Sequence, residues 1–153
     1  DLNLISSSIA LRIIQPFFWG FGSLIKQVVL VLQGRYAGKK AVIVKQYDEG
    51  TKERPYPHAI IAGVEQSPMK ITKRMNATRV ARRSRIKPFI KAVNYNHIMA
   101  TRYSIDIDLK QIVTLETLKD VAARKDARKQ VKTLFQERYN TGKNRWFFQK
   151  LRV

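Results

Sequence analysis

One short stretch of the chain combines cations, an aromatic ring and two glycines, as Gly34-Arg35-Tyr36-Ala37-Gly38-Lys39-Lys40. Cations attract phosphate groups, and an aromatic ring offers a stacking face for a base. Glycines let the backbone take a positive φ or approach a ligand closely, and main-chain amides in such a loop can point at phosphate oxygens. The stretch therefore predicts a nucleic-acid-binding loop. The ordinary alternative is a solvated basic turn.

This loop does not match a nucleoside-triphosphate site. It is one residue shorter than the P-loop pattern, and Lys40 stands where a Ser or Thr would ligate magnesium. The residues that follow, 41–44, read Ala-Val-Ile-Val, which favours a strand, whereas a helix follows a P-loop. We therefore reject a nucleotide-hydrolysing role for the loop.

A second concentration of cations lies in a run without acidic residues, from Gln66 to Ile105. Its core, residues 79–87, reads Arg-Val-Ala-Arg-Arg-Ser-Arg-Ile-Lys. Such a block repels itself and is typical of an arm that becomes ordered on a polyanion, where the planar arginine fork clamps phosphate. We therefore expect residues 69–91 to be disordered in the free protein. A solvated basic loop is the alternative.

The loop, the basic run and a few later residues make up one predicted nucleic-acid-binding set. Its polar members follow the core of the run and can meet sugar, base edge or phosphate. The full set is Gly34, Arg35, Tyr36, Gly38, Lys39, Lys40, Lys73, Arg74, Arg79, Arg82, Arg83, Arg85, Lys87, Lys91, Asn94, Tyr95, Asn96, His97, Arg102, Lys143 and Arg145.

Composition supports a polyanionic partner. The 153 residues hold 30 Lys and Arg against 11 Asp and Glu, a formal net charge of +19. Self-repulsion at that level destabilises a compact chain unless a polyanion supplies counter-charge, and a basic domain is the electrostatic footprint of nucleic-acid binding. A basic membrane-surface peptide would instead show a sustained amphipathic helix. Here the cations are spread over the whole chain after residue 25, so no membrane partner is expected.

Several kinds of chemistry are absent from the sequence. The chain has no cysteine, which excludes disulfides, thiolate zinc sites and a thiol nucleophile. His58 and His97 lie far apart without a nearby carboxylate, so each is interpreted as a packing or hydrogen-bonding residue. No nucleophile–base pair or metal constellation is recognisable. The sequence therefore predicts a protein that is not an enzyme and has no cofactor, metal or small-molecule substrate.

The apolar pattern predicts a mainly β fold with a C-terminal α-helix. β-branched runs at 26–32 and 39–46 flank the loop as a hairpin, and further strands are expected at 58–64, 68–72 and 102–108. Short strands with polar turns indicate a small β-barrel. A helix is expected from Leu118 to Tyr139, with Val131, Leu134 and Phe135 on its apolar face and Gly142 as its stop.

The C-terminal tail places three aromatic residues between cations. Trp146, Phe147 and Phe148 are consecutive, and we expect that a small barrel cannot bury all three. Aromatic residues beside Arg and Lys are typical of contacts within a larger assembly. These three residues are therefore predicted to anchor the tail to a partner.

The first 25 residues differ from the rest of the chain. They contain a single acid and a single base, so the whole net charge of +19 belongs to residues 26–153. The uncharged run from Ile13 to Ile25 is too short to span a membrane as a helix, and Pro16 interrupts it. We expect this apolar segment to be foreign to the functional protein, as when a gene model reads into non-coding sequence. The alternative is a real extension that packs into a groove on a neighbour.

Several stretches resemble the eukaryotic large-subunit ribosomal protein L twenty-seven family. They are Gly34-Arg-Tyr-Ala-Gly-Lys-Lys-Ala-Val-Ile-Val44, Pro55-Tyr-Pro-His-Ala-Ile-Ile-Ala-Gly-Val64, Tyr95-Asn-His97, Thr101-Arg-Tyr-Ser104 and Arg138-Tyr-Asn-Thr-Gly-Lys-Asn-Arg-Trp-Phe-Phe-Gln-Lys-Leu-Arg152. The last stretch is long and rich in rare residues, which makes chance a poor explanation. The resemblance covers roughly residues 26–153, and the lead that the family usually carries is replaced by Leu24-Ile25-Lys26-Gln27.

The resemblance implies an SH3-like barrel bearing a KOW motif at residues 28–44. It divides the chain into an atypical segment (1–25), a barrel core (26–72), a basic RNA-binding arm (73–101) and a strand, helix and aromatic–basic tail (102–153). It implies a structural constituent of the cytosolic large ribosomal subunit, assembled in the nucleolus, with ribosomal RNA and neighbouring ribosomal proteins as partners. The alternatives are a KOW-bearing transcription or RNA-processing factor, which should be soluble alone, and an enzyme such as a nuclease.

Overall fold

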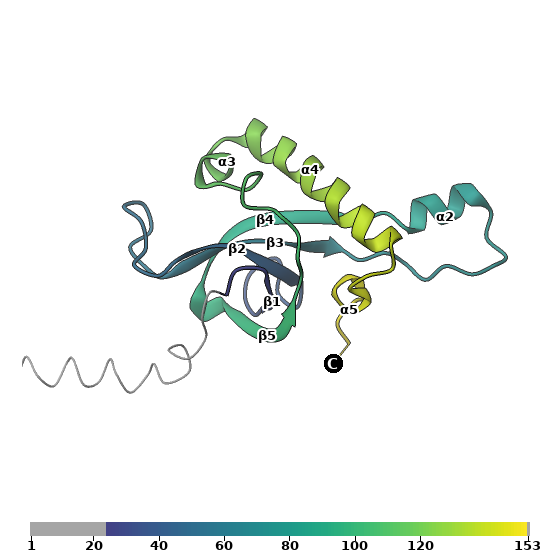
Figure 1. Cartoon of the computed structure of the whole chain (residues 1–153), viewed down its shortest axis with the longest axis horizontal. Coiled ribbons are helices and arrows are strands. Elements are labelled where there is room, and N and C mark those ends of the chain that lie inside the picture. The colour runs from purple at the N-terminus through teal and green to yellow at the C-terminus, as the bar shows by residue number, and fades with distance from the viewer. Residues whose placement is uncertain (1–23, 153) are drawn as a thin grey trace, which may run out of the picture.

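A computed structural model describes residues 24–152, and five antiparallel strands form its one sheet, in the order β4-β3-β2-β1-β5. Helices α3 and α4 pack on one side of this sheet, and α2 projects beyond its end (Figure 1). The elements in chain order are β1 (Gln27–Val31), β2 (Lys40–Tyr47), β3 (His58–Gln66), α2 (Ala77–Arg83), β4 (Lys87–Asn94), the 3₁₀ turn η1 (Tyr95–His97), β5 (Ile98–Ser104), α3 (Leu115–Lys119), α4 (Val121–Asn140) and α5 (Arg145–Phe148).

The predicted hairpin is confirmed. β1 and β2 pair antiparallel, with Val28 opposite Val42 and Leu30 opposite Lys40, and the loop between them contains both glycines. Gly34 and Gly38 take positive φ angles of 92° and 74°, which L side chains rarely adopt. The glycines are therefore needed for the path of this loop.

Both faces of the sheet are buried, which explains why β1, β2 and β3 read as nearly continuous apolar runs. One face carries Val28, Val42, Ile60 and Ile90 and packs against the helices and the tail. The other face joins Val29 of β1 to Phe89 of β4, although two strands separate β1 and β4 in the sheet. The sheet therefore curls round its second face. Its edge strands β4 and β5 do not pair with each other, so the ladder is not closed.

The C-terminal helix is confirmed over most of its predicted length. α4 begins at Val121 because Asp120 accepts hydrogen bonds from the amides of Ala122 and Ala123, both at 3.1 Å. The start predicted at Leu118 instead belongs to the separate short helix α3. α4 ends at Asn140, and Gly142 follows with a φ of 72°. Its buried residues include the predicted Val131 and Phe135, and it lies along β4 and β3 (Figure 1).

The strand predicted at 68–72 is wrong, because those residues form an irregular loop. The strand that completes the sheet is β4, within the acid-free run. Its charge concealed its apolar residues, since Phe89 and Ile90 are buried between exposed Lys87 and Lys91, and Val93 is buried further along the strand. The expectation of disorder is therefore contradicted for residues 87–91. Pro88 is tolerated because β4 is an edge strand.

The strand predicted at 102–108 is only partly right. β5 runs from Ile98 to Ser104, and the residues after it are irregular. The alternation that suggested the strand is nonetheless real, because Ile105, Ile107 and Leu109 are all buried in the main core. Buried and exposed residues therefore alternate directly after β5, where the chain is no longer a strand.

The predicted atypical segment 1–25 falls almost entirely outside the described residues. At its end, the side chain of Leu24 is buried beside Val29 and Ile43, and its amide donates to Oε1 of Gln46 at 3.1 Å. Residue 24 is therefore part of the packed fold.

Candidate nucleic-acid interface

The hairpin loop uses three of its amides within the hairpin and carries cationic side chains. The amides of Ala37, Gly38 and Lys39 donate to carbonyls within the hairpin, at 3.0, 2.7 and 3.0 Å. These three donors are therefore used by the loop itself. Arg35 is exposed and Lys39 is half-buried, so their cationic groups are what the loop offers to phosphate.

Tyr36 has only part of its ring free. Its ring stacks on Phe89 of β4 with centroids 4.0 Å apart and planes 9° from parallel. The cations of Arg35 and Lys91 lie 5.8 and 6.0 Å from the Tyr36 centroid. The loop is thereby fixed to the edge strand, and cations from two separate predicted groups come together round one ring.

The prediction that Lys40 binds nucleic acid is contradicted by its position. Only 4% of Lys40 is exposed, and its Nζ donates to the carbonyl oxygens of Trp146 and Gln149 at 2.5 and 2.8 Å. The same Nζ lies 4.0 Å from the centroid of the Trp146 ring. Burial lowers the pKa of this ammonium group. Lys40 therefore holds the tail against the sheet.

The polar residues after β4 mostly serve the fold. Tyr95 is buried, and its hydroxyl donates to Oδ1 of Asp48 at 2.5 Å; burial, followed by the carboxylate contact, raises the Tyr95 pKa. The side chain of Asn94 accepts from the amide of Asn96 at 3.0 Å and caps η1. These findings contradict the nucleic-acid role predicted for Tyr95 and place the Asn94 side chain in the turn. Asn96 is exposed and His97 is half-buried.

The interpretation of His58 as a packing residue is confirmed. It is fully buried, its Nδ1 lies 2.9 Å from the carbonyl oxygen of Tyr56, and its ring stacks on Tyr47 with centroids 5.0 Å apart. Within the described residues, no group of three acidic, histidine or cysteine side chains could hold a metal ion. None of the helices in residues 24–152 has the length and apolarity needed to cross a membrane.

The arginines of the acid-free run have no acidic partners among the residues that the structure describes. Among residues 24–152 there are five ion pairs, and the cation in each is a lysine: Lys26 with Asp106 and with Asp108, Lys87 with Glu65, Lys119 with Glu53 and Lys129 with Asp126. Lys87 is therefore the sole cation of the run that an acid neutralises in this part of the chain. Exposed members of the run without such a partner in the described residues are Lys70, Lys73, Arg74, Arg79, Arg82, Arg85, Lys91 and Arg102.

Two of the predicted arginines also make contacts within the chain. Arg83 donates from Nη1 to the carbonyl oxygen of Lys70 at 3.0 Å and so holds the loop before α2. Arg102 lies 5.2 Å from the ring centroid of Tyr103 and donates to its hydroxyl at 3.3 Å. Hydrogen bonding to the tyrosine raises the Arg102 pKa, so the group stays charged.

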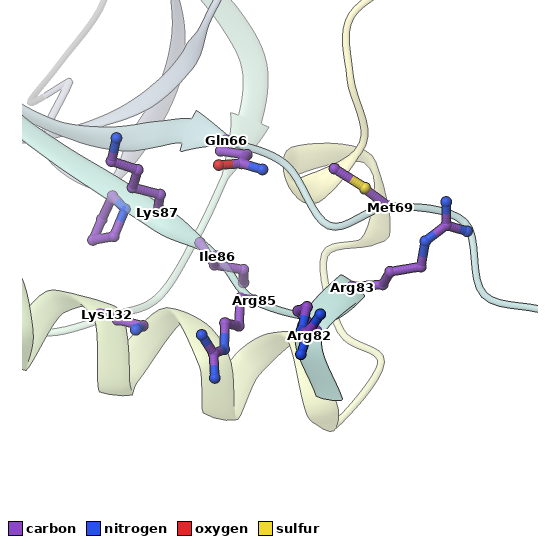
Figure 2. Close-up of a pocket in the computed structure, with 9 residues that line it drawn as sticks. Gln66, Met69, Arg82, Arg83, Arg85, Ile86, Lys87 and Lys132 are labelled. Carbon is purple, nitrogen blue, oxygen red and sulfur yellow. The ribbon is translucent and has the colours of Figure 1, made fainter. Parts of the chain in front are cut away.

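A pocket of about 360 Å³ gathers five cations where α2 meets β4. Figure 2 shows Lys132, Arg85 and Arg82 in that order along α4, whereas Lys87 points away from that helix and Arg83 extends outward on the side of Met69. Lys132 was not among the predicted residues. It lies on a helix whose charged side reads as an ordinary solvated face, and only the packing of α4 brings it to the arginines.

The tail forms a wider groove of about 1030 Å³ with the loop before α2. Its cations are Lys70, Arg145, Lys150 and Arg152, together with the buried Lys40, and it has no acidic lining residue. Arg145 was predicted, whereas Lys150 and Arg152 were missed although both follow closely after the aromatic residues of the tail. The predicted Lys143 is exposed nearby on the turn before α5.

These hollows adjoin one another. A smaller one, of about 220 Å³, lies between Gly38 and Lys39 of the hairpin loop and Lys150 of the tail, and it shares Lys150 with the groove. The groove in turn shares Met69 with the five-cation pocket. The hairpin loop, the tail and the α2–β4 turn therefore border one continuous cationic surface.

Two of the three aromatic residues predicted to anchor the tail to a partner are buried in the chain itself. Phe147 and Phe148 are 2% and 3% exposed, and both rings meet Phe135 of α4 edge-on, with centroids 5.5 and 6.2 Å away. The expectation that this fold could not bury them is wrong, because α4 and the sheet leave a site that α5 fills. Trp146 is only partly buried, beside Tyr103 and under Lys40.

A curved antiparallel sheet with a helical layer and an acid-free cationic surface is typical of small proteins that bind polyanions. The model of the ribosomal L27e protein family matches residues 28–153. Two curated relatives, both called large ribosomal subunit protein eL27, from Candida albicans strain SC5314 and from Candida albicans, are each 56% identical over 126 residues, which is 82% of this chain and 93% of the relative. The chain belongs to the ribosomal L27e protein family.

Proposed function

We propose that this chain is a structural, non-enzymatic constituent of the large ribosomal subunit and that it binds ribosomal RNA. The observation that carries the proposal is the continuous cationic surface, whose arginines have no acidic partner among the described residues. A formal net charge of +19 needs a polyanion of matching extent, and folded RNA supplies phosphate and sugar along such a surface. Family membership and the names of the relatives agree with this role.

Within this role, each part of the surface has its own contribution. Arg35 and Lys39 of the hairpin loop, with Lys91 beside Tyr36, contact the RNA backbone from the sheet. Lys73, Arg74 and Arg79 contact it from the loop and helix that project beyond the sheet (Figure 1). Arg145 and the neighbouring tail cations contact it from the groove. Phosphate contacts of this kind position a protein and recognise the shape of the RNA.

The finer structural reading is also part of the proposal. We propose that the curled sheet is the SH3-like barrel of a KOW protein, and the cluster that joins Val29 to Phe89 across the curl supports it. Residues 26–72 then supply three strands of the barrel, 73–101 the basic segment together with β4 and the start of β5, and 102–153 the end of β5, the helix and the tail. The chain works in the cytosolic ribosome after nucleolar assembly, with ribosomal RNA and neighbouring ribosomal proteins as partners.

Sedimentation of ribosomal subunits tests the proposed role. The tagged chain should remain with large subunits in a sucrose gradient after a high-salt wash, because buried RNA contacts are less exposed to screening than surface ones. Recovery in small complexes outside ribosomes, with binding to transcripts in general, would contradict the proposal and favour the transcription or RNA-processing factor. A nuclease assay on purified chain tests the enzymatic alternative, and we expect no cleavage of RNA.

A further inference from the structure

The five-cation pocket is built by two parts of the chain that are far apart in sequence. Arg82 comes from the last turn of α2, Arg85 from the turn between α2 and β4, and Lys132 from the middle of α4. Figure 2 shows these three side chains on the same side of the pocket, along α4. Like charges repel, so a chain gains nothing from gathering three cations unless an anion lies among them.

These three cations have no side-chain partner in the part of the chain that the structure describes. Arg82, Arg85 and Lys132 form neither an ion pair nor a side-chain hydrogen bond within residues 24–152. The two other cations of the pocket are occupied. Arg83 donates to the carbonyl oxygen of Lys70, and Lys87 lies 3.3 Å from Oε1 of Glu65, on the strand side of the pocket. The pocket therefore has a neutralised side and a side with three uncompensated charges.

The walls of the pocket are held in place before any ligand arrives. Lys132 follows Val131, which is fully buried in the core, so α4 cannot shift easily along the sheet. Nε2 of Gln136, one helical turn further on, donates to the carbonyl oxygen of Ser84 at 3.1 Å and joins α4 to the turn that carries Arg85. Ile86 is buried beneath that turn. A preorganised site loses less conformational entropy when it binds its ligand.

We propose that this pocket binds a phosphate group of the RNA backbone, and that Lys132 of α4 completes the site with Arg82 and Arg85. The inference rests on the proposed RNA-binding function and adds a defined phosphate site to it. Planar guanidinium groups suit the oxygens of a phosphate, which can accept two parallel hydrogen bonds from one arginine. RNA is favoured over free phosphate because the pocket adjoins the continuous cationic surface through Met69.

A matched pair of lysine substitutions on α4 tests the site. Lys125 is exposed and without an ion pair in the described residues, and it lies seven residues, about 10 Å of helix rise, from Lys132. Against deproteinised large-subunit ribosomal RNA, Lys132→Gln should weaken binding by about tenfold or more, whereas Lys125→Gln should change it by about twofold or less. The log–log salt slope should become less steep by about 1 for Lys132→Gln and remain unchanged for Lys125→Gln. Equal effects of the two substitutions would overturn the proposal.

Inorganic phosphate distinguishes the possible sources of the group. In the full-length chain, the Nε–Hε nuclear magnetic resonance signals of Arg82 and Arg85 should shift saturably with phosphate, and Lys132→Gln should abolish the saturation. Ribosomal RNA should then displace the phosphate from the same signals. Saturable shifts that RNA leaves untouched would assign the pocket to free phosphate and overturn the RNA source. If the wild-type chain binds RNA tightly but these signals do not respond to RNA, the proposed phosphate site is wrong, whereas the proposed RNA-binding function is not contradicted.

Discussion

Two regions of this protein carry the same kinds of residues and use them in opposite ways. In the hairpin–tail region, residues 34–40 and 145–149, a lysine and two phenylalanines turn inward, and Nζ of Lys40 lies over the Trp146 ring. In the α2–β4 region, residues 77–87, Arg79, Arg82 and Arg85 stay exposed without acidic partners among the described residues. The difference lies in what packs beside each cation. Two carbonyl groups at the end of α5 converge on Lys40, whereas nothing in the described chain neutralises Arg82 or Arg85.

Residue type alone therefore does not separate a binding cation from a structural one. The acceptors of Lys40 lie 106 and 109 residues further along the chain, and only the folded structure brings them together. An uncompensated cation is costly to a fold that already carries +19, so its retention points to a partner outside the chain. The following predictions test this division between the two regions, in order of decreasing effect on the free energy of unfolding.

The largest effect is expected for Phe147→Ala. Removing this buried ring from the contact with Phe135 should lower the free energy of unfolding by about 3–5 kcal/mol, measured by urea denaturation. Trp146→Ala should cost less, because Trp146 is partly exposed. Unchanged stability of Phe147→Ala together with poor incorporation into subunits would show that the tail serves the assembly, as its sequence suggests.

Lys40→Met should lower the free energy of unfolding by about 1–3 kcal/mol. Methionine fills similar space but leaves the carbonyl oxygens of Trp146 and Gln149 without their donor. The neighbouring Lys39→Gln is the control, and its effect should stay within about 0.5 kcal/mol. In RNA binding the order should reverse, with Lys39→Gln making the salt slope less steep by about 1. If both variants were equally stable, Lys40 would not stabilise the fold through its contacts with the tail.

The double substitution Arg74→Gln with Arg79→Gln should leave stability within about 0.5 kcal/mol of the wild type, because both side chains are exposed and unpaired in the described chain. Binding to ribosomal RNA should weaken, and the salt slope should become less steep by about 2. Thermal melting and salt titration of the same samples separate the two quantities. A melting temperature that falls sharply would mean that these arginines support the fold.

The smallest effect is expected where a surface cation does have an acidic partner. The hydrogen bond from Lys26 holds the pKa of Asp106 below its ordinary value of 3.8. At acidic pH the folded state therefore binds fewer protons than the unfolded state. The stabilisation from this pair is fully present above the ordinary pKa of the carboxyl group, and it is lost as the pH falls through the lower pKa of the folded state. Asp106→Asn should flatten the fall in melting temperature below about pH 4. If the melting temperature of the variant fell below pH 4 as it does in the wild type, the Lys26–Asp106 pair would contribute nothing measurable to stability, which is common for exposed ion pairs.

The sequence predicts best the features that depend on short-range residue patterns. The hairpin and its glycines, β3, α4 and the family resemblance all depend on short-range patterns such as Gly34 to Gly38. The predictions were wrong where contacts between distant parts of the chain decide whether a side chain is buried, as for Lys40, Tyr95, Phe147 and Phe148. β4 was missed because strong charge at Lys87 and Lys91 obscured the buried Phe89 and Ile90 between them. Lys132 could not be found from sequence, since nothing local relates it to Arg82 and Arg85.

The salt dependence of binding to deproteinised large-subunit ribosomal RNA tests the central claim most directly. If about six to eight of the unpaired cations contact phosphates, the log of the association constant should fall against log salt with a slope of roughly −4 to −7. Wild-type chain at several salt concentrations provides the measurement. A slope of that size is the predicted result, and a slope near zero would contradict the account, because the exposed cations would then contribute no phosphate contacts.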